Sequence, residues 1–208
     1  MPPQPQNLDD IDISDSLCLT LNKENFLVRD SIIRKNRIIL FTTKANIQHL
    51  SRVLYWIIDG IFKTVPTIFC QLYTIHTPIG TVDNSRSIIS RFIEFAEESN
   101  ILLRPTTILT DFELTAINAS HDEFPSSVHD SMEIDIPRTS NIVEAWHQHW
   151  ENLVDRSHVG VYTIVTKFQK EQQQVEYQIE TILHGTPCLK PKKDIIEREK
   201  RLDTIIYN

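Results

Sequence analysis

Three separated acidic motifs hold the residues whose types and spacing could do chemistry. Asp59 lies in the segment DGIFK, Asp111 lies in TDFE, and Glu144 lies in PRTSNIVEAWH. Together they have the form of an Asp, Asp, Glu triad. Three carboxylates brought together from distant strands and a helix can hold two Mg²⁺ or Mn²⁺ ions that clamp an in-line phosphoryl transfer. The chemistry that this pattern predicts is the cutting and joining of DNA.

Each of the three acids also has an ordinary structural explanation. Asp59 interrupts an apolar run, where an isolated buried carboxylate is costly unless it is paired or binds metal, but an Asp before Gly60 also suits a turn at a strand end. Asp111 suits a helix N-cap, and Glu113 then complements the helix dipole. Glu144 suits the solvated face of a helix. The residues alone leave the catalytic triad and these structural roles as open alternatives.

The charge balance bounds how the chain could hold DNA. With 208 residues and 40% hydrophobic content, the chain can form one sizeable domain, or a domain core with helical appendages. Its formal net charge of −7 argues against a free-standing DNA-binding protein, because phosphate contacts need a strongly basic face. The best basic segment, 190–193, is followed by a stretch in which Glu197 and Glu199 alternate with basic residues. We therefore expect any DNA contact to be local.

Cysteine and histidine spacing predicts no metal site. Cys18, Cys70 and Cys188 are far apart and odd in number, which predicts reduced structural thiols instead of a disulfide framework or a Cys-x-x-Cys zinc site. His147 and His149 are two residues apart and therefore face different directions on a helix. A histidine-based zinc site is not expected.

The sequence pattern predicts an intracellular chain. The longest apolar stretch, around 53–62, is shorter than the roughly 20 residues that a membrane-spanning helix needs. The first residues lack the basic start and the apolar run of a secretory signal. We therefore expect no membrane partner and a nuclear or cytoplasmic location, not secretion.

The apolar pattern predicts an α/β chain in three parts, which are a poorly ordered, locally packing arm at 1–25, a core at 26–156 and a helical region at 157–208. The expected strands are 26–29, 37–42, 55–62, 68–76 and 106–110. The expected helices are 44–54, 85–98, 112–119, 141–154, 162–183 and 194–206. The first two strands and the first helix form a β-β-α lead-in, and the next two strands form an antiparallel pair. Asp111 then falls at the end of the fifth strand, where sites in α/β sheets commonly lie.

Taken in order, these motifs resemble those of the transposases of Mutator-like elements. The matching segments are 41–43, 47–50, 59–66, 69–76, 110–113, 137–147 and 170–172. The likeness covers most of residues 26–208. Several ordered motifs are together far more specific than any one of them.

The resemblance implies a fold, a site and partners. The fold would be a ribonuclease-H-like core with an incomplete mixed sheet, in which Asp59 on the first core strand and Asp111 at the end of the fourth meet Glu144 on a later helix. These three residues would be catalytic and would bind Mg²⁺ or Mn²⁺, while water and then a DNA 3′-hydroxyl attack phosphodiesters. The implied partners are the DNA ends of a transposon, and a second copy of the chain or a full-length transposase.

The sequence departs from the family pattern at three places, and two of these indicate internal deletions. Ile61 stands where the family usually has Thr, which is a modest change. Only 126–136 remains where the family carries a Cys and His motif and a long helical insertion. The stretch 77–84 is too short for a full third strand, although these extended residues could span roughly 26 Å and serve as a stub. We therefore expect an incomplete core.

Two functions stand as alternatives. The first is a truncated Mutator-like transposase that is inactive or only weakly active. The second is a non-catalytic interaction or DNA-associated module derived from a transposase, with the helices between 141 and 183 binding a partner. Carboxylates of Asp59, Asp111 and Glu144 within about 4 to 6 Å of a common point would favour the first function.

Overall fold

The computed structural model describes residues 3–33, 36–53, 55–77, 95–110, 114–125, 140–155 and 157–183. Several predicted features lie outside these residues, namely Asp111, Glu113, the shortened stretches 78–84 and 126–136, the basic segment 190–193 and the helix at 194–206. In chain order the elements are the 3₁₀ helix η1 (Leu8–Asp10), β1 (Leu27–Ile33), β2 (Asn36–Phe41), α1 (Lys44–Leu50), β3 (Tyr55–Ile61), β4 (Leu72–His76), β5 (Thr107–Thr110), α3 (Leu114–Glu123), α4 (Ser140–Val154) and α5 (Val161–Leu183). The chain is a mixed α/β protein, as predicted.

β3 is the central strand of a three-stranded mixed sheet with the order β4-β3-β5. It pairs antiparallel with β4, so that Asp59 lies opposite Thr74. It pairs parallel with β5, so that Ile58 lies opposite Thr110. The predicted antiparallel pair is therefore confirmed, and the strand that carries Asp59 has a partner on each side.

The predicted β-β-α lead-in is also confirmed. β1 and β2 form an antiparallel hairpin that is a separate two-stranded sheet. α1 follows directly, and Thr43 caps it, because the Thr43 side chain accepts a hydrogen bond from the Asn46 N–H. The cap explains why the chain leaves the strand at this point and enters a helix.

Two elements are shorter than the sequence predicts, and a turn explains each case. α1 ends at Leu50, where the Arg52 N–H donates to the His49 carbonyl at 3.0 Å and tightens the last turn. β4 begins only at Leu72, because the Phe69 N–H donates to the Pro66 carbonyl at 2.9 Å and closes a turn before the strand. Local turn hydrogen bonds therefore override the apolar pattern at both ends.

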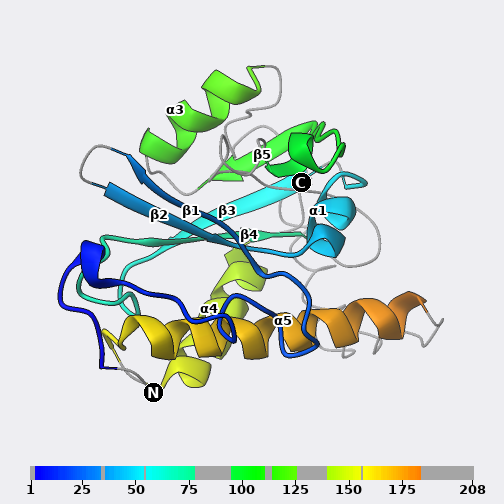
Figure 1. Ribbon diagram of the computed structural model, residues 1–208. Helices are drawn as coiled ribbons and strands as arrows, with labels where there is room; N and C mark the ends of the chain where they lie inside the picture. The colour runs from blue at the N-terminus through cyan, green and yellow to red at the C-terminus, as the bar shows by residue number, and fades with distance from the viewer. Residues whose placement is uncertain are drawn as a thin grey trace.

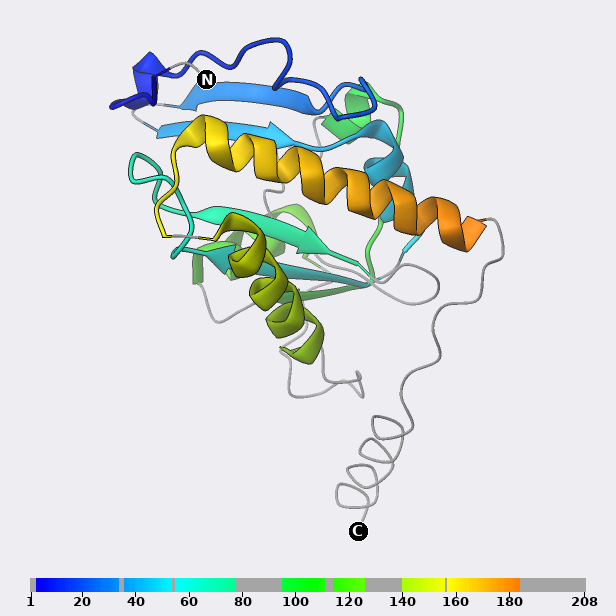
Figure 2. The same ribbon diagram turned by 90° about the horizontal axis from the view of Figure 1, so that it is seen from below.

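Helices lie on both sides of the central sheet. α4 and α5 lie on one side of the strands, and α3 lies on the opposite side (Figure 1). Seen from the side of α4 and α5, α4 crosses the central sheet, while α5 runs between that sheet and the hairpin (Figure 2). α4 is therefore the helix that faces β3, and α5 lies beside it (Figure 2).

Two clusters of buried apolar side chains hold these layers together. The first joins β3 to α4 and α5 and consists of Ile61, Trp150, Val154, Val159, Ile164 and Val165. The second joins the lead-in to the sheet and consists of Leu40, Ile47, Leu50, Trp56, Ala96 and Leu103. The spacing of the buried residues on α4 and α5 follows the period of a helix with one apolar face.

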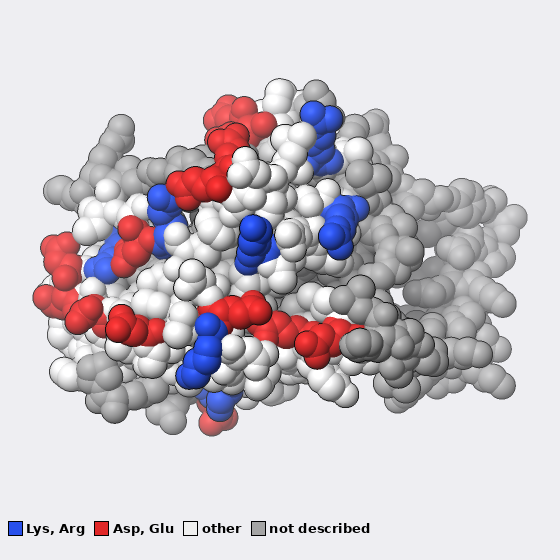
Figure 3. Space-filling model, turned by 45° about the vertical axis from the view of Figure 1, so that its right-hand side comes forward, with Lys and Arg blue, Asp and Glu red and all other residues white. Residues whose placement is uncertain are grey.

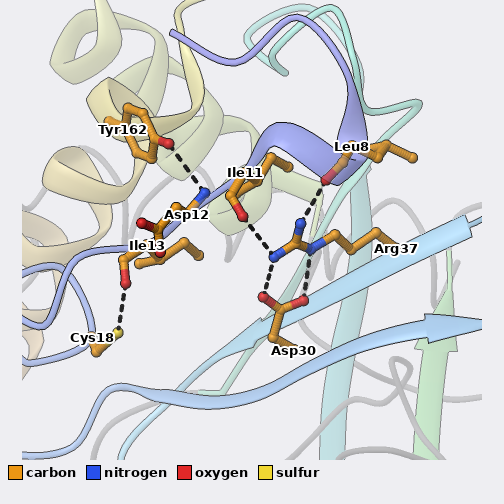
Figure 4. Close-up of polar contacts among 8 residues, drawn as sticks. All are labelled: Leu8, Ile11, Asp12, Ile13, Cys18, Asp30, Arg37 and Tyr162. Carbon is orange, nitrogen blue, oxygen red and sulfur yellow. Dashed lines mark hydrogen bonds and ion pairs between the residues drawn. The ribbon is translucent and has the colours of Figure 1, made fainter. Parts of the chain in front are cut away.

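The N-terminal arm, predicted to be poorly ordered and to pack locally, is tied to both β2 and α5. The Asp12 N–H donates to the Tyr162 hydroxyl on α5 at 3.2 Å, and the Arg37 guanidinium on β2 donates to the Ile11 carbonyl at 3.1 Å (Figure 4). Ile11 itself is only 5% exposed. The arm therefore bridges the hairpin and the last described helix.

Two smaller predictions concern thiols and membranes. Cys18 and Cys70 are free thiols, as predicted, and Cys188 lies outside the described residues. Among the helices that the structure describes, none combines the length and the apolar character needed to cross a bilayer.

Candidate functional site

Asp59 is a buried carboxylate in the middle of the sheet. It lies within β3, which continues through Gly60 to Ile61, and the residue is 8% exposed. The strand-end turn, one of the alternatives for this residue, is therefore wrong. Burial raises the pKa of the Asp59 carboxyl, and His147 and the Gly60 N–H partly oppose this shift. A carboxylate in such a place needs a compensating positive charge.

His147 of α4 supplies the nearest such charge. Its Nε2 contacts Oδ2 of Asp59, and the two form an ion pair when the imidazole is protonated. Both atoms are buried, and neither hydrogen-bonds to any other residue in the described part of the chain. The two side chains come from elements far apart in the sequence, so only the fold brings them together.

A threonine and a second histidine lie on the strand beside Asp59. The Thr74 hydroxyl lies 3.4 Å from the Asp59 carbonyl oxygen and 2.8 Å from Nε2 of His76. The His76 ring packs edge-on against Trp146, with 4.5 Å between ring centroids. Burial, with a smaller effect of His147, lowers the pKa of His76 to about 4. His76 is therefore a neutral imidazole at pH 7.

A shallow hollow of about 220 Å³ opens next to this pair. It is lined by Gly60, Ile61, Phe62, Lys63, His147, Trp150 and Glu151. Lys63 forms an ion pair with Glu151 across the hollow, at 2.8 Å, and the Phe62 side chain is 57% exposed. A small ligand, such as a hydrated cation or part of a phosphate, could therefore reach His147 from solvent.

Aromatic stacking and one carboxylate fix the position of α4. The rings of Trp146 and Trp150 stack at 5.6 Å, and Trp150 stacks on Phe168 of α5 at 5.4 Å. Glu171 of α5 accepts a hydrogen bond from Trp146 Nε1 at 3.0 Å and lies 2.8 Å from His149 Nε2. His149 thus faces α5 while its neighbour two residues earlier faces β3, which confirms the predicted divergence of the two histidines.

The structure describes two of the three residues of the predicted triad, Asp59 and Glu144. Glu144 is exposed on α4, three residues before His147 and therefore on a similar face of the helix. Asp111 lies outside the described residues, but Thr110, which precedes it, pairs with Ile58, which precedes Asp59. The predicted convergence of three carboxylates stays a prediction.

Sequence reasoning missed His147 as a partner of Asp59. The sequence held one weak signal for this role, because His147 is the last residue of the motif that contains Glu144. Helical spacing alone does not say which face of α4 turns toward the sheet, and so it could not select this histidine over His149.

The described residues around Asp59 offer two side-chain atoms that could bind a divalent cation. A carboxylate oxygen and an imidazole nitrogen are both metal donors, and here both are buried and lack other hydrogen-bond partners among the described residues. Within that part of the chain, no group of three or more His, Cys, Asp or Glu side chains is arranged to hold a metal ion. Asp59 and His147 instead pair with each other, so the described residues alone do not form a cation site.

The charged surface limits where DNA could bind. On the face drawn in Figure 3, acidic side chains form a row across the lower part, and Lys and Arg side chains stand in separate places among them. The described part of this face therefore offers no continuous basic stripe for a phosphate backbone.

No protein family, no curated protein and no solved structure matches this chain. What the site does must therefore be inferred from its residues and their geometry.

Proposed function

We propose that this chain is a Mutator-like DNA transposase in truncated form, inactive or weakly active, whose core keeps a metal-binding carboxylate at Asp59. The observation that carries the proposal is the position of Asp59, buried in the central strand of a mixed sheet. A carboxylate is costly there unless a cation compensates it. A role in metal binding gives a reason for keeping it.

The strand arrangement supports the same proposal. The resemblance to Mutator-like transposases implies a ribonuclease-H-like core with Asp59 on its first strand and Asp111 at the end of its fourth. β3 pairs antiparallel with the strand that follows it and parallel with β5, whose last residue, Thr110, precedes Asp111. Parallel neighbours end at the same edge of a sheet, so this register favours two aspartates at one edge.

In the proposed chemistry, the cation and the chain have separate roles. A bound Mg²⁺ or Mn²⁺ would polarise a phosphodiester and stabilise charge on its oxygens. Asp59 would hold the cation, with Asp111 and Glu144 as the further predicted ligands. The buried apolar residues of β3 would exclude water around the carboxylate and strengthen its attraction for a cation.

A non-catalytic module derived from a transposase is the second candidate. Two observations favour it. His147 already faces Asp59 and can balance its charge without a metal, and Glu144 is exposed in the manner of an ordinary surface residue. In this case Asp59 and His147 would be a structural ion pair between β3 and α4.

Mn²⁺ binding separates the two candidates. Isothermal titration calorimetry would compare the full chain with Asp59→Asn and Asp111→Asn, and with Asp122→Asn as a matched control, because Asp122 is exposed on α3. The transposase proposal expects binding by the full chain and the control, and loss of binding in the other two variants. Absence of Mn²⁺ binding by the full chain would favour the non-catalytic module.

A nicking assay then tests the chemistry. Supercoiled plasmid would be incubated with the full chain in Mn²⁺, in Mg²⁺ and in a chelator, and the same three variants would be compared. Weak nicking that needs the cation and both aspartates supports a surviving active site. Metal binding without nicking would indicate a core that holds the ion but has lost the reaction.

A further inference from the structure

We propose that this chain pairs with a second copy of itself by exchanging part of the N-terminal arm. Residues 3–19, the docking segment, would leave their own chain and lie on β2 and α5 of the other copy. The hinge for this exchange is the turn at residues 20–24, which joins the docking segment to the region of β1. The inference goes beyond the proposed function, because it rests on the arm and its hinge and needs no cation at Asp59.

The docking segment is held by contacts that an identical copy can make equally well. The Asp12 N–H donates to the Tyr162 hydroxyl on α5 at 3.2 Å (Figure 4). About two helical turns later, Gln169 donates to the carbonyls of Ser16 and Leu19 at 2.8 and 2.6 Å. All these bonds join residues that are distant in sequence. The same bonds therefore form whether the segment comes from its own chain or from a second copy.

Apolar burial gives the docking segment a second reason to stay on such a surface. Ile11 is 5% exposed and packs in one cluster with Val161 and Tyr162 of α5. Leu17 packs against the cluster that contains Val165. A segment that left this surface would expose its apolar side chains to water, which is unfavourable. On a second copy it buries the same side chains in the same way, so exchange loses no apolar burial.

The hinge is closed by a backbone conformation that is unfavourable for lysine. Lys23 has a φ of 68°, in the left-handed region where the Cβ of an L-residue is crowded. Two hydrogen bonds close the turn in spite of this. The Lys23 N–H donates to the Thr20 carbonyl at 3.0 Å, and the Thr20 N–H donates to the Glu24 carbonyl at 2.8 Å. Short hinges under strain favour domain swapping, because opening releases the strain.

Opening the turn also gives the docking segment the reach that exchange needs. Fully extended, residues 20–24 span about 17 Å. In the closed turn, the N–H groups of Phe26 and Leu27 both donate to the Cys18 carbonyl at 2.9 Å. A docking segment from a second copy brings the same carbonyl to these two N–H groups. The pairing at the start of β1 is therefore restored between copies.

Two exposed apolar residues adjoin the hinge. Leu21 is 41% exposed, and Tyr177 on α5 is 69% exposed. Between them, the Asn22 amide donates to the Glu176 carboxylate at 2.6 Å, which holds the hinge against this part of α5. An exchanged dimer brings its two hinges together about a two-fold axis. It would therefore cover apolar surface that a single copy leaves in water.

The first test measures the dimer in solution by size-exclusion chromatography with light scattering, over a range of concentrations of the full chain. We expect a concentration-dependent dimer. Lys23→Gly removes the crowding that hinge opening relieves, and it should lower the dimer association constant about tenfold per hinge, or about a hundredfold in all. Asp155→Gly is the matched control, because Asp155 has a φ of 67° outside the arm, and it should leave the constant unchanged.

A variant with the opposite effect makes the test sharper. Lys23→Pro fixes φ near −65° and removes the N–H that donates to the Thr20 carbonyl, so the turn cannot close. We expect this variant to shift the chain toward the dimer. Far-ultraviolet circular dichroism would establish that each variant is folded. If Lys23→Pro did not fold, Lys23→Gly and its control would still decide the outcome.

A photochemical cross-link then shows whether the dimer exchanges its arms. Benzoylphenylalanine would be introduced in place of Leu17, which packs against a cluster that includes Val165 of α5. Irradiation of the separated dimer should link one chain to the other, whereas irradiation of the monomer should link each chain only to itself. The same group in place of Ile32, which is 61% exposed on β1, is the control and should not link the chains.

Several results would overturn the inference. These are a full chain that stays monomeric at every concentration, a folded Lys23→Pro variant that stays monomeric, or equal dimer fractions in Lys23→Gly and the unmodified chain. A dimer whose cross-links from position 17 stay within each chain would show association through another surface, and it would also overturn the exchange. None of these results bears on Mn²⁺ binding, so the proposed function is decided by its own test.

Discussion

His76 is a histidine that its surroundings keep neutral. Burial lowers its pKa to about 4 from an ordinary value of 6.5. Between these two values the unfolded chain binds a proton at this side chain and the folded chain does not. The contribution of neutral His76 to stability is therefore complete above pH 6.5 and is lost as the pH falls toward 4.

This shift predicts an acid-sensitive stability. Because each unit of pKa difference is worth about 1.4 kcal/mol, His76 should lower the free energy of unfolding by up to about 3 kcal/mol between pH 7 and pH 4. Urea unfolding at several pH values would measure this, and His76→Asn should flatten the dependence. His121→Gln, an exposed control, should keep the slope of the unmodified chain. An equal slope in His76→Asn would contradict the prediction.

At the level of single residues, sequence could place Asp59 but not its partner. An acid that interrupts an apolar run is easily recognised in the sequence. The run predicts a buried strand, and burying a carboxylate there is costly. His147 carries no such signal. Its contact with Asp59 depends on how α4 is rotated over the sheet, and that rotation is set by Trp146, Trp150 and Glu171 through tertiary packing.

At the level of elements, Glu171 on α5 stabilises the contact between α5 and α4. Its carboxylate serves two partners on α4, the Trp146 indole and the His149 imidazole. The Glu171 side chain is 18% exposed, so water cannot fully replace these bonds. The contact explains how a helix that meets the sheet along a single face keeps one orientation.

Removal of this carboxylate should loosen α4. Glu171→Ala leaves the partly buried Trp146 N–H without its acceptor, which typically costs about 1–3 kcal/mol of unfolding free energy. Glu180→Ala is the control, because Glu180 is exposed near the end of the same helix, and it should stay within about 0.5 kcal/mol. Urea denaturation of both variants would measure the difference. Equal stabilities would show that aromatic stacking alone holds α4.

Element types were more predictable than element ends or strand order. β-branched and aromatic runs marked β3 and β5, and the 3.6-residue spacing marked α4 and α5. The late start of β4 was missed, because a turn at Pro66 competes with a run that looks like a strand. The parallel pairing of β3 with β5 joins segments that are distant in sequence, and no local pattern encodes it.

At the level of the whole molecule, the N-terminal arm is attached to α5 by hydrogen bonds. Gln169 on α5 is 5% exposed and donates to the carbonyls of Ser16 and Leu19 at 2.8 and 2.6 Å. The arm's low periodicity predicted little order because its contacts are long-range. One buried amide on α5 thus satisfies two backbone groups of a segment about 150 residues away.

The arm should therefore depend on Gln169. Gln169→Ala removes the donor for both carbonyls, and we expect a loss of about 1–3 kcal/mol together with faster amide hydrogen exchange in residues 14–25. Gln173→Ala, at an exposed position one turn later, should change neither quantity. Hydrogen exchange read by mass spectrometry would localise the effect. Faster exchange throughout the chain would instead indicate that the arm is part of a single cooperative unit.

The paired indoles of α4 have an optical consequence. Trp146 and Trp150 stack with 9° between their planes and 5.6 Å between centroids, and the sequence has only 3 tryptophans. At this separation the electronic transitions of the two rings couple, and light absorption is shared between them. The near-ultraviolet circular dichroism of the chain therefore contains a pair of bands that arises from α4. The intensity of these bands shows, without any added label, whether α4 is still packed over Asp59.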